Sequence, residues 1–70
     1  MNNWHKSTEE MPTKAGDYLL RGVGGLDHKF HFWLCFYVPS GQGIAKGFYY
    51  NGNEFRNADG EYEWIDVNEL

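Results

Sequence analysis

The chain has 70 residues, of which 41% are hydrophobic, 19% aromatic and 23% charged, and its formal net charge is −4. A chain of this length forms one domain with one core, and its single cysteine, Cys35, excludes an internal disulfide. The acidic balance disfavours nucleic-acid binding, which requires lysine and arginine against phosphates, and no apolar run is long enough to span a membrane.

Residues 1–16 are expected to form an irregular N-terminal arm and turn. Ser7–Glu10 has the spacing of a helix capping box, but Pro12 disfavours helical geometry before it, so we predict at most one short helical turn here. Trp4 and Met11 should pin the arm to the core. The arm has no apolar run of the kind a signal peptide requires, so we expect a cytoplasmic protein.

We predict that residues 1–70 form a single small β-rich domain, with four to five strands after the arm. The expected strands are Tyr18–Val23, Lys29–Val38, Ile44–Tyr50, Asn53–Arg56 and Glu61–Val67. Asn51-Gly52 favours a two-residue hairpin because both residues accept positive φ, and Asp59-Gly60 indicates a second turn. We predict a mainly all-β fold, a small antiparallel meander forming a twisted sheet or an SH3-like, partly open barrel.

Alternation along Lys29–Val38 divides its side chains between two faces. One set is wholly apolar and is predicted to face the core: Phe30, Phe32, Leu34, Phe36 and Val38. The other set is amphipathic and is expected to be partly wet: His31, Trp33, Cys35 and Tyr37. The predicted core joins Phe32, Phe36, Phe48 and Trp64. In the last strand, Tyr62 and Trp64 should point inward, with Glu61 and Glu63 outward.

The sequence predicts no enzyme, no cofactor site and no metal site. Cys35 lies among apolar neighbours, which raise the pKa of a thiol and disfavour its use as a nucleophile. His28 and His31 would project to opposite faces of a strand, and His31 and Cys35 are about 13 Å apart along one. The glycines of Gly22–Gly25 lack the lysine and following helix of a phosphate-binding loop.

The acidic end of the chain is a candidate partner-binding surface. Residues 54–70 hold six acidic side chains against one arginine, a formal charge of −5. The candidate binding residues there are Glu54, Asp59, Glu61, Glu63 and Asp66. Such a surface suits a basic host protein and gives fast, salt-sensitive association. The alternative is that these charges only prevent edge-to-edge aggregation.

A second candidate surface is aromatic. Trp33 and Tyr37, with Tyr49 from the neighbouring strand, could form a platform that stacks bases or anchors a protein. The alternative is that the arm or a closed barrel covers these rings. A homodimer formed through strand edges is a further expected assembly.

The two ends of the chain resemble a family of small bacteriophage and prophage proteins, a domain family of unknown function. Trp4, Glu9–Pro12 and Gly16–Leu20 are similar to its opening, W-x-x-x-E-x-x-P-x-x-G-x-x-V-L-V. The segment Gly47–Phe55 is similar to its aromatic middle, and Tyr62–Val67 resembles its V-T-H-W-M-P-L-P close.

The resemblance implies a β-rich phage accessory protein acting in the host-cell cytoplasm. We therefore predict a non-enzymatic inhibitor of a host protein, such as a restriction or CRISPR nuclease that handles nucleic acid. The alternative function is a single-stranded nucleic-acid-binding module that uses exposed aromatic rings.

Overall fold

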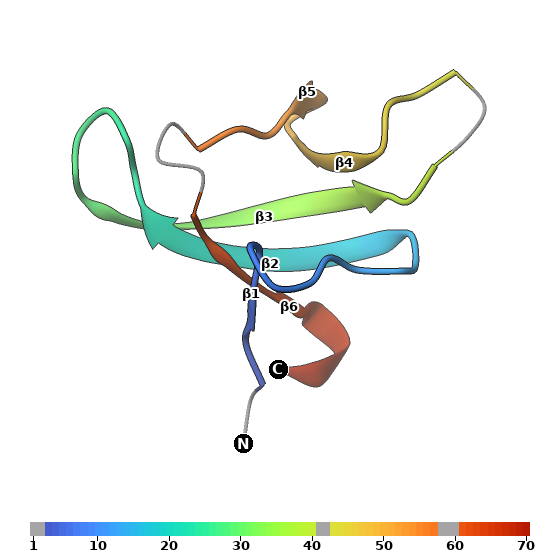
Figure 1. The fold of residues 1–70 in the computed structure, drawn as a ribbon, viewed down its shortest axis with the longest axis horizontal. Coiled ribbons are helices and arrows are strands. Elements are labelled where there is room, and N and C mark those ends of the chain that lie inside the picture. Colours follow the sequence, from blue (N-terminus) through green and yellow to red (C-terminus); the bar gives the residue numbers. More distant parts are fainter. Residues whose placement is uncertain (1–2, 41–42, 58–60) are drawn as a thin grey trace.

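The computed structural model describes residues 3–40, 43–57 and 61–70. In these residues six strands form one antiparallel sheet with the order β1-β6-β2-β3-β4-β5 (Figure 1). The elements are β1 (His5–Lys6), β2 (Gly16–Val23), β3 (Phe30–Val38), β4 (Gly47–Tyr50), β5 (Asn53–Glu54), β6 (Glu63–Asp66) and a 3-10 turn, η1 (Val67–Glu69). The all-β prediction is confirmed, and within these ranges the sheet is open and not closed into a barrel.

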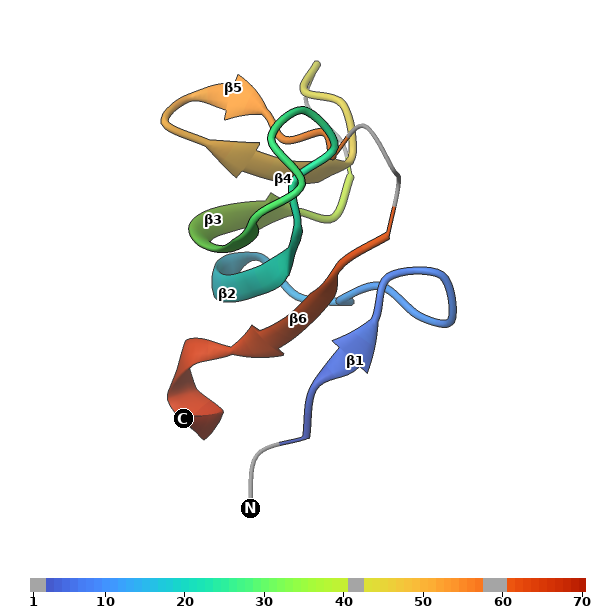
Figure 2. The same cartoon turned by 90° about the vertical axis from the view of Figure 1, so that its left-hand side faces the viewer.

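The strands from β2 to β5 form the expected meander, but the last strand departs from it. After β5 the chain returns across the sheet, and β6 pairs with β2 on the side opposite β3. The arm then adds β1 outside β6, so β1 and β5 lie at opposite ends of the sheet (Figure 2). The predicted Asp59-Gly60 turn falls outside the described residues.

Two turns fix the meander. Asn51 and Gly52 have φ values of 51° and 82°, which confirms the predicted two-residue hairpin between β4 and β5. In the longer β2–β3 loop, the Gly24 amide donates to the Lys29 carbonyl over 2.8 Å, and the His28 amide donates to the Gly24 carbonyl over 3.0 Å. This loop closes the hairpin with Val23 opposite Phe30 and thereby sets the register of the two longest strands.

The core is a cluster of aromatic rings on one face of the sheet, here called the inner face. Its buried members are Tyr18, Leu20, Cys35, Tyr37, Phe48 and Trp64. The Tyr18 ring is central: its centroid lies 6.1 Å from Tyr37, 5.8 Å from Phe48 and 5.5 Å from Trp64, each pair near-perpendicular. Edge-to-face aromatic pairs of this kind stabilise a core beyond their buried area.

The arm covers the inner face and is held there by hydrogen bonds to its backbone. The Trp64 indole donates to the Glu10 carbonyl over 2.9 Å, and the Tyr18 hydroxyl donates to the Lys14 carbonyl over 2.9 Å. Met11 packs against the core as predicted. Trp4 does not, because the next residue, His5, stacks on Trp64 on the inner face, and Trp4 projects to the opposite face near Phe32.

The face assignment predicted for β3 is wrong. Cys35 and Tyr37 are buried, whereas the apolar set predicted as core is exposed for most of its length: Phe30, Phe32, Leu34 and Phe36. Phe48 and Trp64 are core residues as predicted, but Phe32 and Phe36 are not. The reason lies in β2, where Asp17 and Arg21 share a face with Leu19. A face with two charged side chains cannot be the core face, and the register aligns the apolar set with it.

The last strand is shorter than predicted but correctly oriented. Trp64 is buried, Tyr62 packs against the core, Glu61 is exposed and Glu63 lies on the other face of the sheet. At Val67 the chain leaves β6 for η1, so the helical turn lies at this end; the arm has only a hydrogen-bonded turn after Lys6.

Truncation of core and exposed rings should separate the two faces. We expect Phe48→Ala to cost about 3–5 kcal/mol, comparable to the whole stability of a domain of this size. Phe36→Ala should change the free energy of unfolding by less than about 1 kcal/mol, because its ring is already half in water. Urea unfolding in dilute solution measures both, and equal losses would contradict this assignment of faces.

Candidate functional site

The most unusual surface of the molecule is the sheet face opposite the core, here called the outer face. It consists of alternate residues of β3 and β2, which are Phe30, Phe32, Leu34, Phe36 and Val38 with Asp17, Leu19, Arg21 and Val23. Phe30, Phe32, Leu34 and Phe36 are between 47% and 62% exposed. Toward β6 this face is better covered, since Ile65 opposite Leu19 is buried, so the bare area centres on β3.

The apolar row is bordered by charges at matched positions on β2. Leu19 lies opposite Leu34, Arg21 lies opposite Phe32, and Asp17 lies opposite Phe36. Directly opposite residues of an antiparallel pair project from the same face, so the cation and the anion stand two residues on either side of the central leucines. The outer face thus has an apolar centre with a positive and a negative end.

The positive end is held in place by two neighbours. The Arg21 guanidinium donates to Glu63 over 2.7 Å and lies 4.0 Å from the centroid of the Trp4 ring. The Trp4 ring in turn lies 6.4 Å from Phe32. A guanidinium over an indole face is attracted by the ring quadrupole, and the contact limits the freedom of a long side chain. Arg21 is therefore held in place beside the apolar row; Glu63 compensates part of its charge, and Lys6, opposite Glu63, adds a second cation to this end of the face.

The negative end opens onto a groove beside the β3–β4 connection. Asp17, Leu34, Phe36, Ile44 and Tyr49 are among the residues around a mainly apolar space of about 680 Å³. The Tyr49 hydroxyl donates to the Ala45 carbonyl over 2.8 Å, which fixes the wall of the groove. Since Tyr49 lies opposite Phe36 in β4, the groove continues the outer face.

The predicted acidic surface is not gathered in one place. Glu54 lies on β5, whereas Glu63 and Asp66 lie on β6, with β2, β3 and β4 between them. Glu61 is exposed just before β6. Asp59 falls outside the described residues.

Three of these acids also have local partners. Glu54 accepts from Arg56 over 3.1 Å and Glu63 accepts from Arg21. The Asp66 carboxylate caps η1 by accepting a backbone amide. Because a paired or capping carboxylate presents less uncompensated charge, these residues do not combine into one continuous acidic surface.

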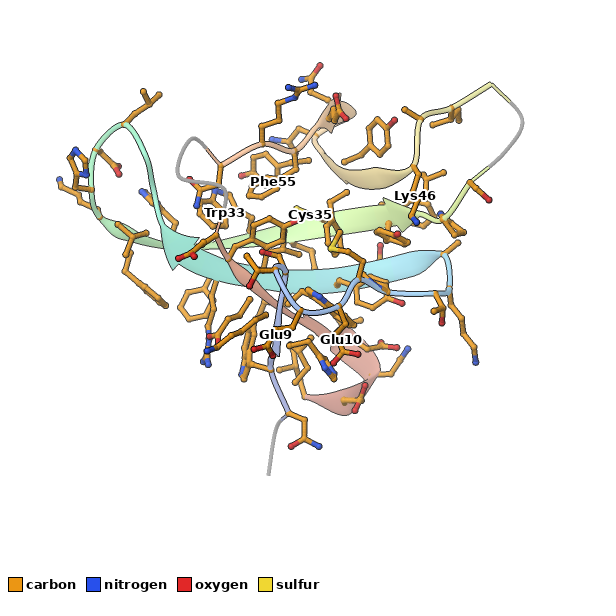
Figure 3. The ribbon with its side chains drawn as sticks, in the orientation of Figure 1. Glu9, Glu10, Trp33, Cys35, Lys46 and Phe55 are labelled. Atoms are coloured by element: carbon orange, nitrogen blue, oxygen red, sulfur yellow. The ribbon has the colours of Figure 1, made fainter. Side chains whose placement is uncertain are left out.

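The three rings of the aromatic platform predicted from the sequence do not lie together on one exposed surface. Tyr37 is fully buried, and Tyr49 lies on the outer face while Trp33 lies on the inner one. Trp33 is half-buried and points toward Phe55, with the ring centroids 5.0 Å apart (Figure 3). These rings close the core, and Phe30, Phe32 and Phe36 of β3 are, with Tyr50 of β4, the more exposed rings in the described part of the chain.

Sequence reasoning missed Phe30, Phe32, Leu34 and Phe36 as surface residues because it ranked faces by hydrophobicity alone. The signal that finds them is in the neighbouring strand, where Asp17 and Arg21 mark the solvent side of β2. That signal becomes informative only once the register of the hairpin is known.

Groups able to do chemistry are sparse in the described part of the chain. Burial on the inner face raises the pKa of the Cys35 thiol to about 11. His31 is held by Asp27 at 2.8 Å, and the backbone amide of Lys29 and His31 lower the pKa of that carboxyl. No cluster of three or more metal-ligating side chains occurs within residues 3–40, 43–57 and 61–70.

In the same described ranges, no helix is long and apolar enough to cross a membrane.

Comparison of the chain with models of protein families, with curated proteins and with solved structures found no match. The resemblance to the phage family is therefore still a prediction from the residues quoted above.

The raised pKa of Cys35 predicts a loss of stability at alkaline pH. The folded thiol keeps its proton up to about pH 11, whereas an exposed thiol titrates near 9.0, so ionisation favours the unfolded chain between these values. In urea unfolding, we expect wild type to lose up to about 1.4 kcal/mol per pH unit more than Cys35→Ala across this window. Parallel pH profiles of the two proteins would contradict a buried thiol.

Proposed function

We propose that the protein is a non-enzymatic protein-binding module and that its contact surface is the outer face of β2 and β3. The observation that carries this proposal is the row of four large, roughly half-exposed apolar side chains on β3. All four lie at positions of β3 that pair with β2, so the sheet holds their backbone in place before a partner arrives. Preorganised surfaces lose less conformational entropy on binding.

The size of the row supports a docking role. A fully buried aromatic side chain covers about 150–250 Å², so three half-exposed phenylalanines with Leu34, Val23 and Ile44 leave roughly 500 Å² of apolar surface. Apolar patches of about 300–600 Å² are the largest that monomers ordinarily carry, and such patches are often functional. The chain exposes 5001 Å² in total, against about 4,500 Å² for an average folded chain of its mass.

The charges of the outer face describe the partner. A complementary protein surface is apolar at its centre, carries a cation where it meets Asp17, and carries an anion where it meets Arg21. Charges at the border of an interface steer association and fix orientation more than they add affinity. The proposed partner is therefore a protein with a patterned surface, not a generally basic one.

A phage-encoded inhibitor of a host nucleic-acid-handling protein is the more specific form of this proposal. The sequence feature that suggests it is the acidic stretch of residues 54–70. Because those acids lie on separated strands with local partners, the proposed contact moves from them to the outer face.

Exposed rings on a sheet also favour a second function, the stacking of single-stranded nucleic acid on Phe30, Phe32 and Phe36. The charges oppose it, since Asp17, Glu54 and Glu63 share the outer face with Lys6 and Arg21. Titration with an oligodeoxythymidylate at low salt should leave the tryptophan fluorescence unchanged. A saturable, salt-sensitive change would favour this second function.

Photo-crosslinking from the outer face tests the main proposal. A photoreactive amino acid replacing Leu34, in protein produced in bacterial cells, should yield an adduct of discrete mass. The matched control is the same replacement at Leu26, which is 94% exposed but lies in the β2–β3 loop. We expect position 34 to give an identifiable protein adduct and position 26 to give none.

Lysine substitutions at positions 34 and 26 test whether the adduct depends on the apolar row. Leu34→Lys should abolish the adduct formed from a photoreactive group at Val38, at the end of the same row, and should leave the fold intact, because position 34 is exposed. Leu26→Lys should leave it unchanged. Equal labelling from both sites, or an adduct insensitive to Leu34→Lys, would overturn the proposed docking face.

A further inference from the structure

We infer that the protein docked on the outer face is a second copy of this chain, packed face to face about a two-fold axis that passes through the Leu19–Leu34 pair. This inference rests on the proposed function, keeps its docking face, and names a second copy in place of a host protein as the occupant. The surface described above as complementary, with an apolar centre and a charge of each sign at its border, is one that the chain itself carries.

The self-complementarity follows from the register of β2 and β3. On β2 the outer face reads Asp17, Leu19, Arg21, so opposite charges stand at equal distances from a central leucine. A two-fold axis lying between the sheets and perpendicular to the strands reverses strand direction but keeps β2 over β2 and β3 over β3. It therefore places Arg21 of each copy over Asp17 of the other, and an interface of this type uses the same patch twice.

The same rotation matches the apolar row. Leu34 meets Leu34 on the axis, and Phe32 of each copy meets Phe36 of the other, since both lie two residues from the centre. Packed sheets are about 10 Å apart and rotated by about 30°. Positions 17 and 21 are only about 7 Å from the axis along the strand, so such a rotation displaces them by a few ångströms. An arginine side chain spans that displacement.

The area is that of a stable dimer. Interfaces of standard size bury about 800 Å² on each partner, of which about 65% is apolar in homodimers. The roughly 500 Å² of bare apolar surface, with the charged and aromatic residues at its border, meets that requirement. A host protein would need to match both the apolar row and the two charges, whereas a second copy matches them by symmetry.

Pairing through strand edges, the assembly expected from the sequence, is less favoured by the structure than contact through the outer face. The edge strands β1 and β5 span two residues each in the described part of the chain, and the stretch of β3 beyond its pairing with β4, residues 30–35, is covered near its middle by Phe55 against Trp33. Short edge strands present few backbone groups for addition of another strand. The outer face is therefore the stronger site for self-association.

The test measures mass in solution by analytical ultracentrifugation across protein concentration, for wild type and single variants. Wild type should sediment as a dimer at micromolar concentrations. Leu34→Lys should raise Kd at least about 100-fold, because two lysines meet on the axis in an apolar contact. Leu26→Lys should leave Kd unchanged. Circular dichroism of each variant establishes that it is folded.

A charge exchange tests the register of the two copies. Asp17→Arg opposes two cations in its own dimer and Arg21→Asp opposes two anions, so each should raise Kd about tenfold. Mixed in equal amounts, the two variants should form a heterodimer, since both charge pairs are then restored. Arg21→Asp also removes the Arg21–Glu63 contact and could impair folding. Asp17 is exposed and makes no side-chain hydrogen bond within the described residues, so Asp17→Arg alone still tests the register.

The outcomes separate the inference from the proposed function. A wild-type chain that stays monomeric at concentrations about 100-fold above the micromolar range expected here overturns the dimer. So does a dimer whose Kd does not change with Leu34→Lys. If the monomer still crosslinks another protein from position 34, the docking face stands and its partner is not a second copy. If position 34 crosslinks nothing, both fail.

Discussion

The structure depends on the register of the β2–β3 hairpin. Tyr18 opposite Cys35 and Leu20 opposite Trp33 bring the residues of the aromatic core to one side of the sheet. A slip of one residue would exchange the faces of one strand and place Asp17 and Arg21 over the core rings. The loop hydrogen bonds from Gly24 to Lys29 and from His28 to Gly24 hold this alignment, and both the closed core and the bare outer face follow from it.

The sequence predicted the elements better than it predicted their environments. Aromatic and β-branched residues bounded by turn residues located β2 and β3 to within two residues, and Asn51-Gly52 located the β4–β5 hairpin, because both signals depend on local backbone preferences. The exposed face of β3 could not be predicted in this way, since the apolar residues of a strand face the core only where the neighbouring strand permits it. The separation of Glu54 from Glu63 likewise depends on the return of β6 to β2, a long-range pairing with no local signal.

The inner face shows how a chain of only 70 residues forms a core. Tyr18, Tyr37, Phe48 and Trp64 cover much area with few residues, and the tyrosine and indole polar atoms that reach the arm recruit its backbone as a lid. Arm and core are therefore one cooperative unit. Most aromatic side chains of this face pack into the core, whereas the large apolar side chains that stay exposed on β3 lie on the opposite face.

The two faces of the sheet also determine how far association can proceed. The arm seals the inner face through Glu10 and Lys14, and β1 and β5 offer only two residues each at the described sheet edges. In the proposed two-fold pair, the outer face of each copy is occupied by the other copy, so the assembly closes at two chains. By covering the core rings, the arm would also keep the inner face from serving as a second contact surface of such a pair.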